Sequence, residues 1–381
     1  MKIGVDVSTW IHQQGYGRCT RGLLGALLDL DHHNDYLLFL DSETAACAKD
    51  LPEGQRIHRV VVKTSRAATQ AASVEGHRSL FDLWSMSQAV CRRGNDLDLF
   101  FFPSVYTFFP LRAKTKVVVT IHDLIAGSYP QLVLPFWKSR FFWRLKIQYA
   151  LRKANLIITA SEKAKKDILE KHDLDDKKVK VIPLGVSKIF RPLSIPPGPF
   201  ILYVGNFSPH KNLTTLLQAY HRLLTKDGFL DIKLVIIGDF KNNGSLTNYN
   251  RLQREIGKRG LTQQVVFTGH LPDEKLIQFY NSAVLLVSPS LDEGFGLPGL
   301  EGMACGTPVV ASRAGALPEV MGEAAQFFDP HRPDELAERM EEILRSEPLR
   351  SEMRRRGLER ARKFSWELSA RSLLSLFEKN V

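Results

Sequence analysis

The sequence has few cysteines and no long apolar run. Its four cysteines lie far apart without a Cys-x-x-Cys pair, which argues against a zinc site or a disulfide framework and is typical of the reducing cytosol. No stretch of about 20 apolar residues occurs, so we expect no segment that spans a bilayer. The first seven residues alternate in polarity and include an acid, which indicates a β-strand rather than a signal peptide. These absences predict a cytoplasmic protein.

Basic residues outnumber acidic residues in the first half of the chain. Residues 1–185 hold 27 Lys and Arg against 19 Asp and Glu, so +8 of the net charge of +11 lies there. A basic surface suits anionic partners such as lipid headgroups, nucleic acid or phosphorylated ligands, although a surface that is basic only for solubility explains the charge equally well. No helix-turn-helix, RNA-binding or zinc signature is present, so we expect no nucleic-acid partner.

Short apolar segments alternate with helical patterns, which predicts parallel sheets with helices on both faces. A length of 381 residues favours two domains, and four prolines between residues 190 and 199 mark a linker. We therefore expect an α/β protein with two Rossmann-like, doubly wound domains facing across a cleft. The first covers residues 1–188, the linker covers residues 189–199, and the second begins at residue 200. The predicted strands are residues 2–7, 36–40, 58–62, 97–102, 116–120, 156–159, 180–182, 200–204, 233–237, 265–268, 284–288 and 308–311. The predicted helices include residues 20–30, 79–92, 139–153, 248–258, 273–282 and 365–379.

The segment from Leu291 to Ser312 carries the strongest chemical signal. A strand ends before it, Gly294 and Gly296 let backbone N–H groups approach a ligand, and Pro298 suits the first turn of a helix whose dipole favours phosphate. Glu293 stands just before this helix and Glu301 about one turn into it. Two carboxylates so placed suit hydroxyl groups at two ends of one ligand, whereas a helix cap would account for Glu293 alone.

Glu293 and Glu301, with seven residues between them, resemble the E-x7-E signature of retaining glycosyltransferases of family 4, which have the GT-B fold. The surrounding EGFGLP…E…ACGTPVVAS matches that family almost letter for letter, and the resemblance extends over nearly the whole chain. It implies that Glu293 holds hydroxyls of the transferred sugar and that Glu301 binds the nucleotide ribose. The implied donor contacts also include Gly294, Phe295, Gly296 and Leu297.

The loop from Tyr203 to Leu213 resembles the family segment whose lysine neutralises the donor diphosphate, so Lys211 is implied for that role. A fixed cation there would stabilise the charge that develops on the leaving group. Asn206 in the same loop is a candidate donor contact. The sequence departs from many family members at His210, where they carry an arginine, which leaves a phosphate site with a single cation or an arginine supplied from elsewhere.

Two further segments resemble family elements of the first domain. The resemblance implies that His122, which follows a predicted strand as His-Asp-Leu, contacts the donor sugar near the reacting carbon. Gly15 and Gly17 lie between the first predicted strand and helix, where the family uses a glycine loop to approach phosphate and acceptor. Asp41 at the end of the second strand invites a dinucleotide interpretation, but Thr20 replaces the third glycine and that fingerprint fails.

The resemblance implies that residues 1–188 bind the acceptor, residues 200–364 bind the donor, and the helix in residues 365–381 crosses back to the first domain. We expect a metal-independent, retaining hexosyltransferase related to bacterial mannosyltransferases of polysaccharide synthesis. Asp96-Leu97-Asp98 spells a metal motif of another transferase fold but only opens a predicted strand, so no metal and no cofactor is expected. GDP-mannose is the first expected donor, a UDP-sugar is the second, and the acceptor is a glycan or a lipid-linked glycan.

Residues 134–146 mix aromatic and basic side chains. This composition fits a helix seated on an anionic membrane, at the inner face of which a lipid-linked acceptor would be met. It fits a sheet-covering helix with a basic outer face equally well, and the sequence leaves both interpretations open.

Three other functions remain as alternatives to glycosyl transfer. A sugar-nucleotide epimerase or a phosphorylase could share the fold, and conversion of a free sugar nucleotide or phosphorolysis of a glycan would reveal it. A basic nucleic-acid-binding protein would show salt-dependent affinity for DNA without binding sugar nucleotides. A binding protein without turnover is disfavoured by the complete set of candidate residues.

Overall fold

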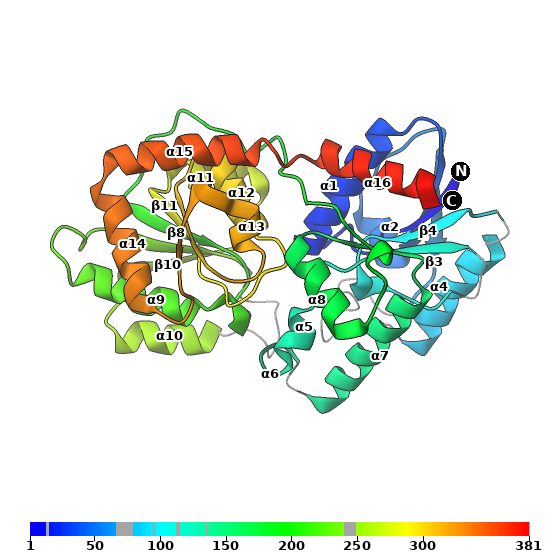
Figure 1. The fold of residues 1–381 in the computed structure, drawn as a ribbon, viewed down its shortest axis with the longest axis horizontal. Helices are drawn as coiled ribbons and strands as arrows, with labels where there is room; N and C mark the ends of the chain where they lie inside the picture. The colour runs from blue at the N-terminus through cyan, green and yellow to red at the C-terminus, as the bar shows by residue number, and fades with distance from the viewer. Residues whose placement is uncertain are drawn as a thin grey trace. The chain divides into compact units, whose positions relative to one another are not determined.

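The computed structural model describes residues 1–12, 15–65, 79–93, 96–111, 115–134, 136–239 and 249–380. Two compact units make up the chain (Figure 1). The first consists of Met1–Pro130, Leu134–Gly185 and Ser365–Val381, and the second of Gln131–Val133 and Val186–Phe364.

The first unit contains a seven-stranded sheet in the order β3-β2-β1-β4-β5-β6-β7, in which each strand pairs with its neighbours in parallel. Its strands are β1 (Lys2–Asp6), β2 (Asp35–Asp41), β3 (Ile57–Val62), β4 (Leu99–Phe102), β5 (Lys116–Thr120), β6 (Leu156–Thr159) and β7 (Val179–Val181). Its helices are α1 (Gly15–Leu30), α2 (Ser42–Cys47), α4 (Leu80–Arg93), α5 (Ile125–Ser128), α7 (Trp137–Lys153), α8 (Glu162–His172) and α16 (Trp366–Asn380), with short 3₁₀ turns at Val105–Thr107 and Asp176–Lys178. Helix α6 (Pro130–Val133) begins in this unit, and its last three residues group with the second.

The second unit contains a six-stranded parallel sheet in the order β10-β9-β8-β11-β12-β13. Its strands are β8 (Phe200–Val204), β9 (Lys233–Ile237), β10 (Val265–Gly269), β11 (Leu285–Ser288), β12 (Val309–Ser312) and β13 (Ala325–Phe328). Its helices are α9 (Leu213–Leu224), α10 (Tyr249–Lys258), α11 (Asp273–Ser282), α12 (Leu297–Ala304), α13 (Leu317–Met321), α14 (Pro333–Arg345) and α15 (Glu347–Ala361), with 3₁₀ turns at Pro209–Lys211 and Gly322–Ala324.

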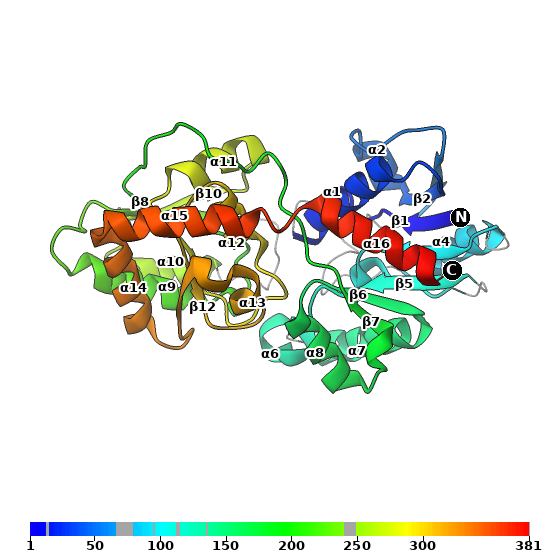
Figure 2. The ribbon, with the colours of Figure 1, turned by 45° about the horizontal axis from the view of Figure 1, so that its top comes forward.

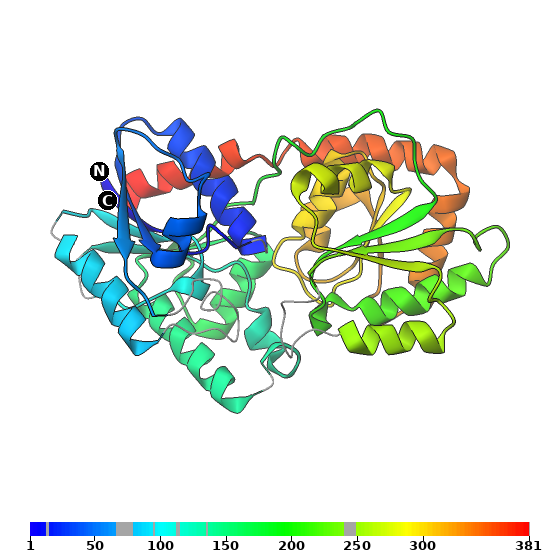
Figure 3. The ribbon, with the colours of Figure 1, turned by 180° about the vertical axis from the view of Figure 1, so that it is seen from behind.

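Helices cover both faces of the first sheet. Helices α1 and α16 pack against each other on one face, and α4 and α7 cover the other (Figures 1 and 3). Right-handed crossovers require this division, because the chain moves towards β3 through α1 and back across the sheet through α4 and α7. The inner strands are accordingly apolar on both sides: all four residues of β4 are fully buried. The prediction of two doubly wound α/β domains is confirmed.

The last helix completes the core of the first unit, although it follows the second unit in the chain. Figure 2 shows α16 beside α1 in the first unit. Ala370, Leu373 and Phe377 of α16 are fully buried in that core, and the Phe377 ring lies 5.5 Å from the ring of Phe101 in β4. Trp366 at the start of α16 lies close to Gly22 and Gly185, because a Cβ atom at Gly185 would stand 2.1 Å from the Trp366 backbone nitrogen.

The structure differs from the sequence prediction in the assignment of the linker and in one additional strand. The predicted linker, residues 189–199, contains no helix or strand, but it groups with the second unit. Asn281 holds it there, since its Oδ1 accepts a hydrogen bond from Leu193 N at 2.6 Å and its Nδ2 donates to the Arg191 carbonyl at 3.0 Å. Strand β13 is a further element that the strand prediction lacks. The predicted helix start at Asn248 lies outside the described residues.

Two glycines of α1, Gly22 and Gly25, provide a matched test of how α16 packs against that helix. Replacing Gly22 with alanine puts a Cβ 2.3 Å from the Trp366 ring, whereas a Cβ at Gly25, one turn further along α1, meets nothing within 4 Å. We expect Gly22→Ala to lower the thermal unfolding midpoint. Gly25→Ala should raise it, because alanine stabilises a helix interior by about 0.5–1 kcal/mol over glycine. Equal shifts in both variants would contradict the packing of Trp366 on α1.

Candidate active site

The strand order changes direction between β8 and β11, and ligands of doubly wound sheets bind beyond the carboxyl ends of such a strand pair. The chain leaves β8 at Val204 and β11 at Ser288. The loops that follow carry Lys211 and Glu293, which are 82 residues apart in sequence. The sheet topology therefore brings the two most strongly indicated side chains of the second unit to one place.

Lys211 and Glu293 form an ion pair, with Nζ donating to Oε1 at 2.5 Å. Their side chains are 15% and 14% exposed, and the Ser290 hydroxyl also donates to Glu293 Oε1 at 3.0 Å. Burial alone would raise the pKa of Glu293, but the charge and hydrogen bond of Lys211 outweigh it and hold the pKa below its ordinary value. The site thus contains an ionised carboxylate beside an ammonium group.

The loop that carries Lys211 is anchored by its neighbour Asn212, which adopts a left-handed conformation with φ of 57°. Asn212 Nδ2 donates to the carbonyls of Pro289 and Pro330 at 3.0 and 2.8 Å. A backbone hydrogen bond of 2.7 Å from Leu291 N to the His210 carbonyl ties the same loop to the segment after β11. These bonds fix Lys211 and Glu293 relative to each other.

The Glu293 loop is held from its other side by Gly315. Gly315 has φ of +56°, and a Cβ atom there would lie 2.4 Å from the backbone nitrogen of Glu293, so only glycine fits without a shift of backbone. Ala316 N donates to the Glu293 carbonyl at 2.9 Å. Sequence reasoning missed Ser290, Asn212 and Gly315 as parts of the site. A glycine shortly after a strand end was the available signal for the last of them.

Helix α12 begins beside this pair. Gly296 is its N-cap with φ of 93°, and Leu297 and Pro298 open its first turn, as the sequence predicted. Phe295 and Leu297 are buried, and the Phe295 ring packs 5.8 Å from the Phe364 ring. Of the predicted donor contacts Gly294, Phe295, Gly296 and Leu297, the buried two therefore offer a ligand their backbone rather than their side chains. The first N–H groups of this eight-residue helix are of the kind that bind phosphate.

Glu301 lies deeper than the prediction of a ribose contact suggests. Its residue is 2% exposed, and its Oε2 accepts a hydrogen bond from the Tyr280 hydroxyl at 2.9 Å. The neighbouring Cys305 thiol feels this carboxylate. Burial, and then the Glu301 charge, raise the pKa of the thiol to about 12. The two glutamates thus have different surroundings: Glu293 is paired with a cation, whereas Glu301 is packed under α11.

Asn206 and His210 shape the loop after β8. Asn206 Oδ1 accepts from Ser208 N at 3.2 Å, and its carbonyl accepts from the Tyr203 hydroxyl at 2.8 Å. Burial, and then the Lys211 charge, lower the pKa of His210 to about 4, so this histidine is neutral at pH 7. The position where many family members have an arginine consequently provides no second cation here.

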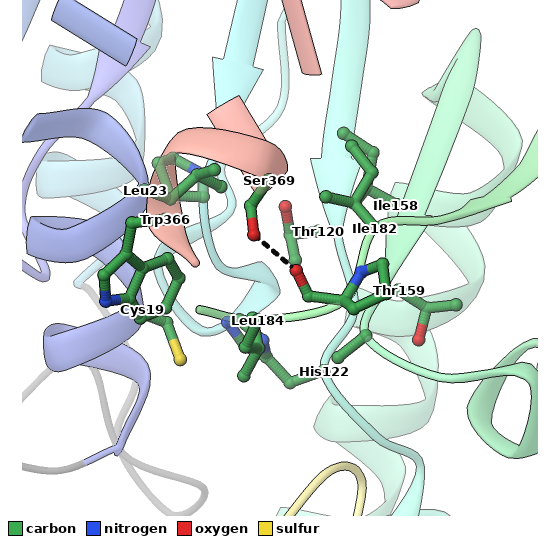
Figure 4. A pocket seen from close by; sticks show the side chains of 13 residues that line it. Cys19, Leu23, Thr120, His122, Ile158, Thr159, Ile182, Leu184, Trp366 and Ser369 are labelled. Atoms are coloured by element: carbon green, nitrogen blue, oxygen red, sulfur yellow. Dashed lines mark hydrogen bonds between the residues drawn. The ribbon is translucent and has the colours of Figure 1, made fainter. Parts of the chain in front are cut away.

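His122 follows β5 in the first unit and lines a small cavity with residues of β6 and α16 (Figure 4). The cavity has a volume of about 10 Å³, close to the space that one water molecule needs. Neither ring nitrogen of His122 has a hydrogen-bond partner among the described residues. Burial lowers the pKa of His122 to about 4, and the Pro103 carbonyl opposes that shift in part. The ring is therefore neutral at pH 7, with a proton on one of its two nitrogens.

Gly15 and Gly17 do not form the loop that the sequence predicted, because α1 already begins at Gly15. A Cβ atom at Gly17 would lie 2.0 Å from the His12 carbonyl oxygen, so glycine is required where the preceding turn presses against this first helical turn. Asp41, which invited the dinucleotide interpretation, caps α2 by accepting a hydrogen bond from Thr44 N at 2.9 Å.

Asp98 likewise bonds to the backbone, since its Oδ2 accepts a hydrogen bond from Lys2 N at 2.8 Å.

Within the described ranges, no group of three or more His, Cys, Asp and Glu side chains is arranged to hold a metal ion. Metal independence stays a prediction. No helix in the described part of the chain combines the length and apolar character needed to cross a bilayer.

GT-B glycosyltransferases consist of two units, each built on a doubly wound sheet of parallel strands, with a loop and a helix suited to phosphate in one of them. Solved structures share this architecture with the chain. Sucrose-phosphate synthase from Thermosynechococcus elongatus superposes with a TM-score of 0.76 at 20% identity, covering 100% of this chain and 98% of that one. HepE from Anabaena, solved in complex with UDP-glucose, gives 0.73 at 19% identity, covering 99% and 100%.

Residues 14–188 match the family described as Glycosyltransferase Family 4, and residues 187–360 match Glycosyl transferases group 1. O-antigen chain mannosyltransferase B of Escherichia coli is 30% identical over 265 residues, covering 66% of this chain and 67% of that protein. The chain belongs to the glycosyltransferase family. It is also 30% identical over 278 residues to the serotype-specific mannosyltransferase WbdA of Escherichia coli, covering 69% of this chain but only 33% of WbdA's length.

Removing one partner of the Lys211–Glu293 pair should cost stability. In Lys211→Met, a nearly buried carboxylate loses its cation, and we expect a loss of about 3 kcal/mol at pH 7, the lower end for buried pairs. The loss should shrink as the pH falls, because protonation removes the unpaired charge. The double variant Lys211→Met/Glu293→Gln should recover much of it in thermal unfolding. If the double variant is as unstable as the single one, the loss has another cause.

The two buried histidines predict a pH dependence of stability. Their folded pKa values of about 4 lie below the ordinary value of 6.5, so the unfolded chain takes up protons first as the pH falls. The stabilisation is therefore complete above pH 6.5 and is lost progressively towards pH 4. We expect His210→Asn to flatten this part of the curve of unfolding midpoint against pH. An identical slope in the variant would show that other groups control it.

Proposed function

We propose that this protein is a retaining, metal-independent hexosyltransferase that moves a sugar from a nucleotide donor to a glycan or lipid-linked acceptor in cell-surface polysaccharide synthesis. The observation that carries the proposal is the Lys211–Glu293 pair at the start of α12. In a sugar nucleotide, the bond that breaks joins the sugar to a phosphate. A cation suited to the phosphate and a carboxylate suited to sugar hydroxyls therefore need to be neighbours, as they are here.

The proposed reaction needs no protein nucleophile. The acceptor hydroxyl attacks the anomeric carbon from the face on which the nucleoside diphosphate departs, so the configuration is retained. The new carbon–oxygen bond forms as the bond to the phosphate oxygen breaks, and that oxygen takes the acceptor's proton. Lys211 and the first N–H groups of α12 stabilise the charge that develops on the diphosphate, which is the role that a metal ion would otherwise fill. Glu293 orients the sugar, and His122 is proposed to contact it near the reacting carbon.

The relatives favour mannose as the sugar. Both Escherichia coli relatives are named as mannosyltransferases, and one is an O-antigen chain enzyme. GDP-mannose is thus the first proposed donor, and a UDP-sugar is the second because HepE was solved with UDP-glucose. We also propose that the protein acts in the cytoplasm with peripheral contact at the inner face of an anionic membrane, where a lipid-linked acceptor would be met.

A thermal-shift screen tests the donor. Protein is mixed with GDP, UDP, ADP and their sugars, each with Mg²⁺ and with EDTA. A ligand present at about a hundred times its dissociation constant adds about 2.7 kcal/mol to the stability of the folded state. We expect GDP or GDP-mannose to raise the unfolding midpoint equally with and without Mg²⁺. A shift that requires Mg²⁺ would overturn metal independence, and folded protein that responds to no nucleotide would overturn the donor site.

Glu293→Gln separates sugar binding from nucleotide binding. The amide keeps the volume of the side chain but loses the charge and the acceptor pair, so we expect transfer to fall by at least about a hundredfold. Binding of the nucleoside diphosphate, measured by calorimetry, should stay within a few-fold of the unsubstituted protein. Glu323→Gln, an exposed site in the same unit, is the matched control. Loss of diphosphate binding in Glu293→Gln would place this glutamate at the nucleotide end of the donor.

A further inference from the structure

Helix α7 has apolar side chains on two opposite faces. Trp143, Ile147, Ala150 and Leu151 are buried and cover the sheet of the first unit. Trp137, Phe141, Leu145 and Tyr149 follow one another at four-residue intervals, so they form a stripe along one side of the helix. This stripe is exposed: the four residues have exposed fractions of 72%, 53%, 46% and 38%. The sequence left a membrane face and a core face as alternatives. The structure has one buried apolar face on this helix and one exposed apolar face.

The exposed stripe extends to neighbouring residues. Phe142 is 64% exposed and its ring lies 5.8 Å from that of Phe141, and Phe136 before the helix is 61% exposed. Helix α4 covers the same face of the sheet as α7 (Figures 1 and 3). Near its start, Leu80, Phe81 and Trp84 are exposed. Two helices that present apolar side chains outward from one sheet face suit a broad partner better than a narrow groove-binding one.

The charges around the stripe have one sign. Helix α7 contains six Lys and Arg and no acidic residue, and none occurs between Asp123 and Glu162. The exposed cations Lys138, Arg144, Arg152 and Lys153 alternate with the stripe along the helix. Aromatic side chains with a basic border are what an interfacial helix needs, because rings enter the headgroup region while cations meet lipid phosphates.

We propose that the α7 stripe, Trp137, Phe141, Phe142, Leu145 and Tyr149, docks the protein on a bilayer that contains anionic lipid. A second copy of the chain is a poorer occupant, because a twofold contact would bring two sets of the same cations face to face. The inference rests on the proposed function only for its purpose, which is to bring the active site to a lipid-linked acceptor. The lipid binding itself requires no catalysis.

Flotation of the full-length protein with vesicles tests this surface. We expect it to float with phosphatidylcholine vesicles that contain about 30% phosphatidylglycerol and to stay behind with phosphatidylcholine alone, with the bound fraction falling as salt is added. Phe141→Ser/Phe142→Ser should reduce the bound fraction at least about tenfold, since each Phe that enters the bilayer contributes a large part of the apolar contact. Lys138→Gln/Arg144→Gln should reduce it by roughly fivefold for each charge.

Leu230→Ser, at an apolar site of the second unit that is 71% exposed, is the matched control and should float like the unsubstituted protein. The thermal shift with nucleotide should be unchanged in Phe141→Ser/Phe142→Ser, which shows that the variant is folded and separates this inference from the proposed function. Flotation that is absent, or equal in the aromatic variant, would overturn the proposal. So would a dimer that this variant dissociates, or a preference for single-stranded oligonucleotide over vesicles.

Discussion

The change of strand order between β8 and β11 is the constraint on which the donor half of this protein depends. Two adjacent parallel strands end side by side, and the chain departs from them in opposite directions, which leaves room for a ligand between the loops that follow. Lys211 and Glu293 lie in the loops that follow these two strand ends. Asn212, the His210 carbonyl and Gly315 each attach one loop to the next. The cost of holding two nearly buried charges is offset because they face each other at 2.5 Å.

The paired state also bears on how a donor would enter. In the free protein, Lys211 neutralises Glu293, so a phosphate must share this ammonium group or replace the carboxylate as its partner. A sugar whose hydroxyls donate hydrogen bonds to Glu293 would replace the contact with Lys211 that the carboxylate loses when the phosphate binds. Diphosphate alone satisfies the lysine only, whereas the complete donor satisfies both groups. This difference favours recognition of the sugar nucleotide as one unit.

Sequence patterns predicted the fold well where local signals were strong. Strands β5, β6, β8 and β9 match the predicted residues end to end, because each is a short β-branched run between clear helix and turn signals. Strand β13 was missed because Ala325–Phe328 is short and only partly apolar. The start of α1 was misplaced, since glycines at positions 15 and 17 indicate a loop unless the close approach of the His12 carbonyl is known. The residues of the site came from a family resemblance. The ion pair, however, joins two residues that are 82 apart in sequence and that follow strands adjacent only in the folded sheet.

The position of α16 has a consequence for the order of folding during synthesis. The ribosome releases every residue of the second unit before it releases α16, yet Ala370, Leu373 and Phe377 belong to the core of the first. The nascent first unit therefore waits, with the α16-binding surface of α1 and Phe101 uncovered, while a complete second unit of contiguous chain can form. Apart from three residues of α6, the unit made later can therefore complete its core before the unit made earlier.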